Sequence, residues 1–173
     1  DVLTGVVNPS GRLPLAIPAL RGGQPGTYLA PVLGWISDGI SNLDPRPLYP
    51  FGYGMSYTSF ELLDEEVSSP TMAADGAVAY SVTVRNSGER SGSEVVQLYL
   101  EDPWAEVVRP LKQLVGFLKV DLEPGEARRL PFDVHAGRTS FTGADGRRIV
   151  GPGEILLSAG ASSEDRRAGC PVT

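Results

Sequence analysis

Residues 78–100 read VAYSVTVRNSGERSGSEVVQLYL, two apolar runs separated by a polar stretch. In the first run, apolar side chains recur at every second position, at Val78, Tyr80, Val82 and Val84. Successive side chains of a β-strand point to opposite faces, so this period predicts a strand with one buried face. The sequence Asn86-Ser87-Gly88 then predicts a turn that ends the strand.

The second run has apolar side chains on both faces. Val96, Leu98 and Leu100 fall on one face, and Val95, Gln97 and Tyr99 fall on the other. A strand whose two faces are both largely apolar is covered on both sides. We therefore expect this run to be a central strand.

Short alternating segments continue on either side of these two runs. They predict further strands at 60–67, 114–122, 130–134 and 155–159, and a hairpin across Asp145-Gly146 that joins the segment around Phe141 to residues 147–150. Pro124-Gly125 suits a type II turn. Pro131 has no N–H group, so its position must face away from a hydrogen-bonded neighbour.

The spacing of these segments is typical of a two-sheet fold, and no segment has a sustained helical period. The predicted fold class is all-β. We expect an antiparallel immunoglobulin-like or fibronectin type III-like β-sandwich over roughly residues 60–160, followed by a polar tail.

Residues 1–58 have a different composition. They hold eight of the fifteen prolines and nine of the twenty-one glycines, which interrupt every apolar run, so this part does not form a core alone. After the turn sequence Asn8-Pro9-Ser10-Gly11, apolar Leu13, Leu15 and Ile17 alternate with other residues. This predicts an extended or edge segment whose apolar side faces a partner. Further apolar residues without cover, which predict an interface, are Trp35, Ile36 and Leu43.

The run PLYPFGYGMSY at 47–57 predicts a stiff connector. Proline fixes φ, glycine permits positive φ, and clustered aromatic rings require apolar cover. We expect an irregular segment held between two packed bodies.

Composition excludes several classes of protein. The net charge of -6 and pI of about 4.8 leave no basic surface for nucleic acid. No apolar run approaches the roughly 18 residues that a membrane-spanning helix requires. Cys170 is the only cysteine, so no disulfide forms within the chain. The chain starts with neither an initiator Met nor a signal-peptide pattern, so we expect a piece of a longer protein.

Catalytic and metal-binding patterns are hard to find. The only histidine, His135, follows a predicted strand and is expected to be a loop or surface residue. His135 and Cys170 match no metal-ligand spacing, and Asp145-Gly146 lacks the further ligands of a calcium loop. Gly52-Tyr53-Gly54 is no phosphate-binding loop. We predict no metal site and no cofactor.

Paired carboxylates are the remaining acid–base option. The candidates lie mostly in turns or at strand ends, where solvated carboxylates are expected: Asp64, Glu65, Glu66, Asp102, Glu106, Asp121, Glu123 and Glu126. Trp35 and Trp104 are of a type that stacks on sugars, although packing is the more common role.

Several motifs together resemble a known family. In order, they are DVLTG (1–5), NPSGRLP (8–14), PLYPFGYGMSY (47–57), EVVQLY (94–99), RP (109–110), GF (116–117), LEPGE (122–126) and PGE (152–154). This series resembles the C-terminal end of glycoside hydrolase family 3, of the β-glucosidase and β-xylosidase type.

The resemblance implies a parent protein with an N-terminal barrel domain that carries an Asp nucleophile, and an α/β sandwich domain that usually supplies the acid/base. Residues 1–20 would end the α/β domain, 21–58 would form the linker, and 59–173 would form the fibronectin type III-like domain. The family's nucleophile motif has no counterpart here, since Ser37-Asp38 is followed by Gly39. The resemblance therefore assigns no catalytic residue to this chain and implies that the fragment alone is inactive.

The parent would hydrolyse β-linked glucosides or xylosides with retention, from the non-reducing end. This chain would supply stability and docking, with a loop such as 105–109 near the active-site rim. Two alternatives stay open: a free-standing sugar-binding module that uses Trp104, and a structural interaction domain without a ligand. The uncovered apolar surface of 1–58 favours the latter of these two.

Overall fold

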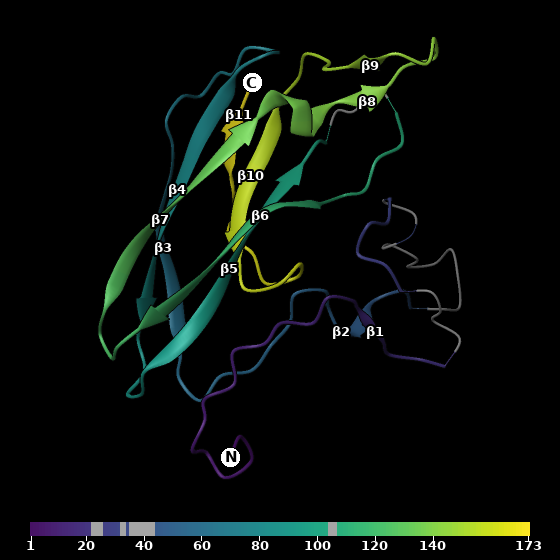
Figure 1. Cartoon of the computed structure of the whole chain (residues 1–173). Coiled ribbons are helices and arrows are strands. Elements are labelled where there is room, and N and C mark those ends of the chain that lie inside the picture. The colour runs from purple at the N-terminus through teal and green to yellow at the C-terminus, as the bar shows by residue number, and fades with distance from the viewer. Residues whose placement is uncertain (22–25, 32–33, 35–43, 104–106) are drawn as a thin grey trace.

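The computed structural model describes residues 1–21, 26–31, 34, 44–103 and 107–173. Two antiparallel sheets face one another (Figure 1). One sheet has the order β3-β4-β7, formed by Phe60–Val67, Ala77–Asn86 and Ala127–His135. The other has the order β11-β10-β5-β6, formed by Cys170–Val172, Ile155–Gly160, Gly92–Glu101 and Gln113–Leu122. The predicted antiparallel β-sandwich is confirmed.

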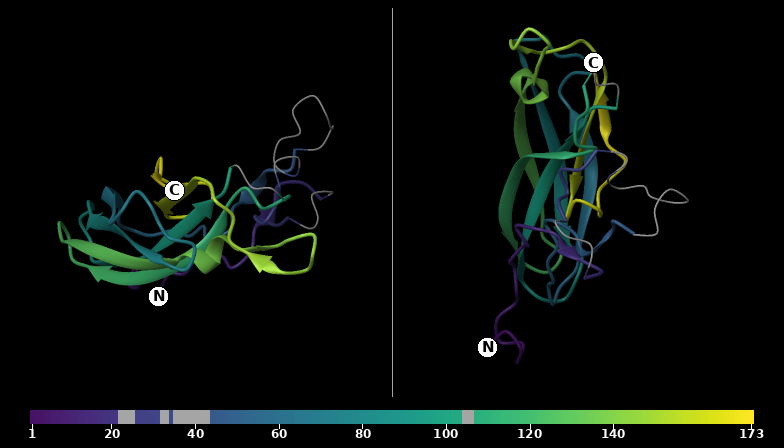
Figure 2. Two further views of the ribbon diagram at one scale, coloured as in Figure 1. Left: turned by 90° about the horizontal axis from the view of Figure 1, so that it is seen from above. Right: turned by 90° about the vertical axis from the view of Figure 1, so that its right-hand side faces the viewer.

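Smaller elements complete the described chain. Two short strand pairs are present, β1 (Ile17–Pro18) with β2 (Pro47–Tyr49), and β8 (Phe141–Thr142) with β9 (Arg148–Ile149). A 3-10 turn covers Ala136–Thr139. No helix in the described ranges is long and apolar enough to cross a membrane. Figure 2 shows the sheets as two layers, with the N-terminal segment along one side.

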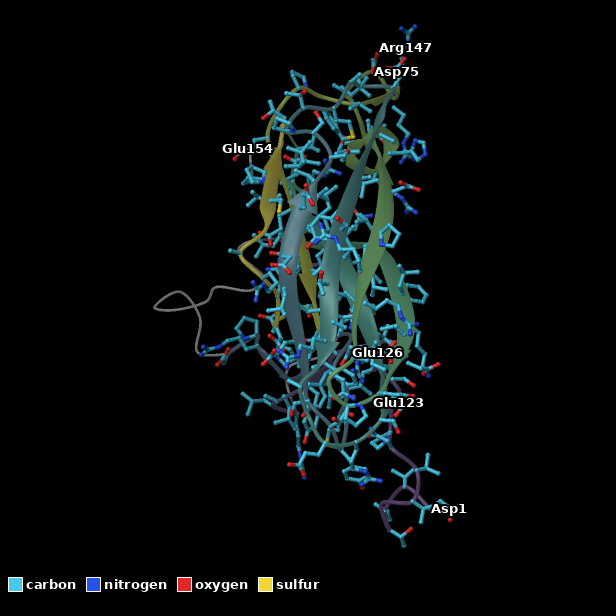
Figure 3. The ribbon with its side chains drawn as sticks, turned by 90° about the vertical axis from the view of Figure 1, so that its left-hand side faces the viewer. Asp1, Asp75, Glu123, Glu126, Arg147 and Glu154 are labelled. Carbon is cyan, nitrogen blue, oxygen red and sulfur yellow. The ribbon has the colours of Figure 1, made fainter. Side chains whose placement is uncertain are left out.

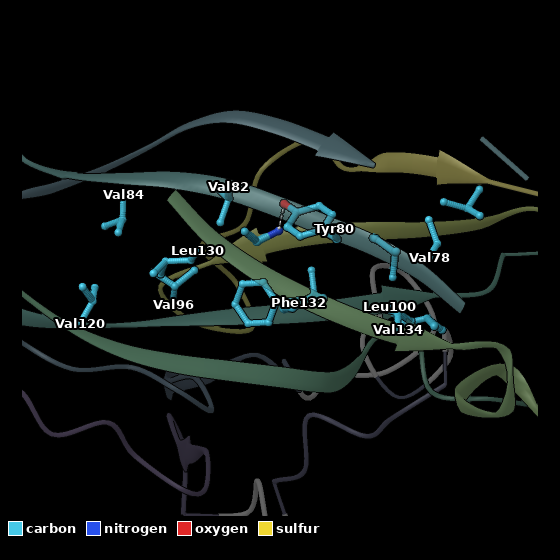
Figure 4. Close-up of a cluster of buried hydrophobic side chains, with 14 of the residues drawn as sticks. Val78, Tyr80, Val82, Val84, Val96, Leu100, Val120, Leu130, Phe132 and Val134 are labelled. Atoms are coloured by element: carbon cyan, nitrogen blue, oxygen red, sulfur yellow. Dashed lines mark hydrogen bonds between the residues drawn. The ribbon is translucent and has the colours of Figure 1, made fainter. Parts of the chain in front are cut away.

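The core lies between the sheets and follows the predicted alternation. The four apolar residues of β4, Val78, Tyr80, Val82 and Val84, are at most 2% exposed. Figure 4 shows them beside Leu130 and Phe132 of the neighbouring strand β7 and above Val96 of the facing sheet. β5 is buried on both faces because Val96, Leu98 and Leu100 pack in the core and its outer face is covered by residues from 1–58. The prediction of a central strand is correct.

The turn predictions are also confirmed. Gly125 has φ of 79°, the positive value that a type II turn needs, and the Glu126 amide donates to the Glu123 carbonyl at 2.9 Å. Gly146 has φ of 79° between β8 and β9, as expected for the hairpin at Asp145-Gly146. Pro131 lies in β7, an edge strand that pairs only with β4 among the described strands.

The predicted polar tail after residue 160 is wrong. Residues 170–172 form β11, which pairs with β10, and Val172 is buried. Ser162 and Ser163 are buried as well. Polar residues can fold back in this way because their backbone and side-chain groups find partners: the Arg167 amide donates to the Ala159 carbonyl at 2.9 Å, and Arg166 pairs with Glu101.

The apolar side predicted for residues 13–17 is partly uncovered within the described chain. Leu15 is 52% exposed, and the buried residue of this stretch is Ala16. The chain here runs so close to the connector that the Leu13 amide donates to the Tyr53 carbonyl and the Gly52 amide donates to the Leu13 carbonyl, both at 2.8 Å. A small side chain fits such a close approach better than leucine does.

The two outer faces of the sandwich differ in character. The outward positions of β4 and β7 are small, polar or charged: Ala77, Ala79, Ser81, Thr83, Arg85, Arg129, Pro131, Asp133 and His135. On the other sheet, the outward side chains Gln97 and Tyr99 of β5 are buried. This second face is the one that residues 1–58 contact.

Candidate functional site

A buried polar contact joins the connector to β5. Gln97 is 3% exposed, and its Nε2 donates to the carbonyls of Gly52 at 3.1 Å and Ala161 at 2.7 Å. Its Oε1 accepts a hydrogen bond from the Tyr99 hydroxyl at 2.6 Å. One buried amide therefore ties the connector, the chain after β10 and β5 together. We call the contact of residues 8–16 and 50–58 with β5 the joint.

Gly52 allows the backbone to approach Gln97. Its φ is 81°, and a Cβ at this position would overlap the Gln97 amide group. Only glycine meets both conditions, because positive φ is strained for other residues and no side chain fits the space.

A buried ion pair crosses the joint. The Arg12 guanidinium binds the Glu94 carboxylate, and these side chains are 10% and 7% exposed. The same carboxylate oxygen accepts the Val95 amide at 2.8 Å. Gly54 packs against this pair, and a Cβ there would overlap the Gly11 carbonyl and the Arg12 side chain. The motif around Arg12 therefore docks on the first half of β5.

Asn8 clamps the other end of the connector. Its Oδ1 accepts the Tyr57 amide at 2.8 Å and the Ser56 hydroxyl at 3.1 Å, and its Nδ2 donates to the Ser91 carbonyl at 3.1 Å. The sequence indicated only a turn at Asn8. Hydrogen bonds from one side chain to two distant segments leave no periodic signal in the sequence.

Aromatic packing holds the middle of the connector. The Phe51 ring stacks on Tyr28 with centroids 4.1 Å apart, and Tyr28 meets Tyr99 edge to face at 6.3 Å. The Phe51 carbonyl accepts the Ser163 amide at 2.9 Å. The connector is thus fixed to the sandwich, which is one of the two packed bodies predicted to hold residues 47–57.

The opposite side of residues 1–58 lacks cover within the described chain. Only Ala16 and Gly52 are buried among the described residues of this part. Of the exposed large apolar side chains among the described residues, most lie here: Val2, Leu3, Val6, Val7, Leu15, Leu20, Leu29, Leu48, Tyr49, Met55 and Tyr57. An apolar surface of this extent is typical of an interface.

The predicted catalytic candidates do not assemble. His135 is exposed at the end of β7, and Cys170 lies half-buried in β11. Burial raises the pKa of the Cys170 thiol, and the Glu65 carboxylate raises it further, so the thiol is not an activated nucleophile. No group of three or more His, Cys, Asp or Glu side chains among the described residues is arranged to hold a metal ion.

The candidate carboxylates are tied to separate partners. Glu65 binds the Tyr80 hydroxyl, Glu66 pairs with Arg129, Asp102 with Arg109, and Glu126 with Arg128, while Asp121 accepts the Ser93 hydroxyl. Arg129 also donates to the backbone carbonyl of Asp64. Figure 3 shows Glu123 and Glu126 toward the end of the sandwich where Asp1 lies, with Glu154 toward the other end. Among the described residues, no two of these carboxylates share a side-chain partner.

The shifted carboxyl pKa values also argue against a catalytic acid among the described residues. A hydrogen bond from the Arg46 side chain lowers the pKa of Asp44 to about 2, and the Glu123 amide followed by Arg128 lowers the pKa of Glu126. Lowered values keep both groups ionised, whereas a carboxylic acid that protonates a leaving group needs a raised pKa.

A cavity of about 320 Å³ opens at the end of the sandwich next to the β8–β9 hairpin. Its lining is mainly apolar, with Thr173, Asp102 and Thr139 as polar members. Arg109 pairs with Asp102, and the Thr139 hydroxyl donates to the Ala136 carbonyl at 2.8 Å. Both groups are therefore already engaged. Trp35, Ile36, Leu43, Trp104, Glu106 and Ser37-Asp38-Gly39 lie outside the described residues.

Comparison with known proteins gives a consistent set of relatives. Residues 94–163 match the family of fibronectin type III-like domains. The chain is 40% identical over 172 residues to a periplasmic β-glucosidase of Salmonella typhimurium, covering 94% of this chain and 22% of that protein. It is 38% identical over 167 residues to a β-xylosidase of Formosa agariphila, covering 95% of this chain and 23% of that protein.

Solved structures agree over nearly the whole chain. A β-glucosidase from Listeria innocua in complex with glucose superposes with a TM-score of 0.88 at 33% identity, covering 99% of this chain and 25% of that one. A GH3 β-glucosidase of Bifidobacterium adolescentis gives a TM-score of 0.82 at 29% identity, covering 100% and 27%. The chain thus spans about a quarter of the length of the relatives that it matches.

Proposed function

Because this chain carries the C-terminal region of glycoside hydrolase family 3, including its fibronectin type III-like domain, we propose that it is the docking and stabilising part of a retaining, exo-acting β-glycosidase. The substrate of the whole protein would be a β-linked glucoside or xyloside. The names of the relatives, β-glucosidase and β-xylosidase, support both choices equally.

We place the catalytic carboxylates outside this chain, in an N-terminal barrel domain and an α/β domain of the parent. The separate pairing of the described carboxylates supports this placement, because retaining hydrolysis needs two carboxyl groups roughly 5 Å apart with different protonation states.

We further propose three parts: 1–20 as the end of the α/β domain, 21–58 as the linker and 59–173 as the fibronectin type III-like domain. The contrast in burial supports a boundary near residue 58. β3 begins at Phe60, and from there the described chain builds one shared core.

The observation that carries the proposal is the two-sided character of residues 1–58. One side is bound to β5 by buried polar contacts through Arg12 and Gln97. The other side exposes large apolar residues such as Leu15 and Leu48, at 52% and 58%. A segment that is fixed on one side and apolar on the other suits a joint between two bodies.

The test compares this chain with the whole protein that its gene encodes. We expect the chain alone not to hydrolyse aryl β-glucosides or β-xylosides, the whole protein to hydrolyse at least one of them, and a separately produced upstream part to bind the chain. Hydrolysis by the chain alone at the rate of the whole protein would overturn the placement of the catalytic residues. Saturable binding of xylan or cellulose by the chain, lost in Trp104→Ala, would instead support an independent sugar-binding module.

A further inference from the structure

The sandwich has four sheet edges, and three of them carry features that prevent pairing with another strand. β3 is interrupted by a bulge at Asp64, whose φ is 51°, and carries the charged Glu66 beside it. β7 has Pro131 and a row of charged side chains. β11 has only three residues, one of which is Pro171. Edges of this kind remain unpaired in solution.

The fourth edge, β6, lacks this protection at its centre. The strand has ten residues and no proline, and its middle reads Gly116-Phe117-Leu118. Phe117 is 65% exposed and Leu118 is 36% exposed. The bulge in β6 falls at Val115, before this run, and the first charged residue, Lys119, follows it. A long edge with exposed apolar side chains at its centre is a surface for another body.

Two exposed apolar side chains lie at the centre of this edge, one on each face of the sheet. Phe117 lies opposite Gln97 and faces outward, whereas Leu118 lies opposite Val96 on the core side, where the open edge leaves it 36% exposed. We call the β6 edge with these two side chains the β6 patch. Among the described residues from 59 onward, the other exposed large apolar side chains are Val107 and Val108, in the loop whose Arg109 binds Thr139, and Ile149 on β9. The outward face of β4 and β7 has none.

The β6 patch is continuous with the joint. Phe117 lies opposite Gln97 in the β5–β6 register, so it is next to the side chain that holds Gly52. On one side of the patch, Lys119 Nζ donates to the Ser10 hydroxyl at 2.9 Å. On the other side, the Leu111 amide donates to the Ala30 carbonyl at 3.0 Å. The described residues of 1–58 therefore contact the sheet or its preceding loop on both sides of the patch and leave Phe117 exposed.

We infer that the β6 patch is a second contact surface for the upstream part of the same polypeptide, and this inference rests on the proposed function. The occupant follows from two observations. The patch adjoins the uncovered apolar side of residues 1–58, so one body can cover both. The relatives that match this chain are about four times as long, so under the proposed function a body large enough would belong to the same protein.

Hydrogen exchange tests the inference in the whole protein. We expect the β6 amides that do not pair with β5 to exchange at least tenfold more slowly in the whole protein than in this chain alone. Equal exchange rates in the two would overturn the inference.

Variants test it by affinity. Phe117→Ser changes a side chain on the outer face of β6, so the chain should fold, which circular dichroism verifies. We expect it to weaken binding to the separately produced upstream part by about tenfold or more. The matched control Ile149→Ser, at a residue 40% exposed, should leave the affinity unchanged.

The outcomes separate this inference from the proposed function. If the unmodified chain does not bind the upstream part and the whole protein hydrolyses neither glycoside, both the proposed function and the inference are wrong. If the unmodified chain binds and Phe117→Ser binds equally well, only the inference fails. If sedimentation shows a dimer of the chain alone that Phe117→Ser dissociates, the occupant is a second copy and the inference is wrong.

Discussion

Arg12 and Glu94 are 82 residues apart in the sequence and form an ion pair almost entirely removed from solvent. The pair links the turn at residues 8–11 to the first half of β5. Because both charges have lost most of their hydration, each depends on the other for compensation. The N-terminal segment is therefore an integral part of the sandwich surface.

Removal of Arg12 should release this segment. In Arg12→Met, Glu94 keeps its charge but loses the guanidinium that compensates it. We expect the free energy of unfolding to fall by about 3 kcal/mol at most. The decrease is limited because residues 1–20 can detach and let water reach the carboxylate. Limited proteolysis should cut within residues 8–16 faster than in the unmodified chain. The control Arg147→Met breaks an ion pair whose side chains are 84% and 60% exposed and should change nothing measurable. Equal proteolysis rates would contradict the role given to Arg12.

Substitution of Gly52 by alanine should lower the free energy of unfolding by more than the strain of its positive φ alone. Gly52 and Gly125 have nearly the same φ, 81° and 79°, but a Cβ at Gly52 would overlap Gln97 while a Cβ at Gly125 would meet nothing. We expect Gly125→Ala to lower the free energy of unfolding by about 1 kcal/mol, from positive φ alone. Gly52→Ala should lose about 2 kcal/mol more because Gln97 must move. Urea denaturation of both variants measures the difference, and equal losses would show that the contact with Gln97 is unimportant.

Truncation of Phe51 should loosen the joint. Phe51→Ala removes the ring that stacks on Tyr28, and because Phe51 is only half-buried we expect a loss of about 2 kcal/mol rather than that of a core phenylalanine. The same change at the exposed Phe117 should leave thermal unfolding of the chain unchanged. A Phe51→Ala variant that unfolds at the unmodified temperature would count against this placement.

The chain should lose stability at alkaline pH through two buried tyrosines. Burial, followed by the Glu65 hydrogen bond, raises the pKa of Tyr80, and burial raises the pKa of Tyr99. Below pH of about 10 both phenols are neutral in the folded and unfolded states. Above it, the unfolded chain loses these protons first, so the free energy of unfolding falls as pH rises.

Tyrosine absorbance during an alkaline titration measures this effect. We expect two phenols to ionise only together with unfolding, and Tyr80→Phe to reduce the alkaline loss of stability. Free ionisation of all six tyrosines while the fold remains intact would contradict the prediction.

Much of the sandwich could be predicted because its core uses strict alternation. The segment 78–84 identifies β4, and the Pro124-Gly125 turn is correctly placed. β11 could not be predicted, because Cys170, Pro171 and Val172 are too few for a period and the strand forms only where β10 offers an edge. The bulge at Asp64 turns Glu65 toward Tyr80 without any local sequence signal.

The joint was harder to predict than the core. Its existence followed from the prolines, glycines and aromatic residues of 47–57. Its contacts did not, because Arg12 with Glu94 and Gly52 with Gln97 are polar partners separated by tens of residues. A single sequence shows which residues have charges or amides, and only the folded chain shows which of them meet.

The position of Gln97 has a mechanical consequence. Its amide holds backbone carbonyls of Gly52 and Ala161, and the Phe51 carbonyl is bound by the Ser163 amide close by. The connector is thus bound to the sandwich through its main chain at two adjacent residues, so it cannot rotate freely there. A domain attached to residues 1–20 would therefore keep a fixed orientation relative to the sandwich.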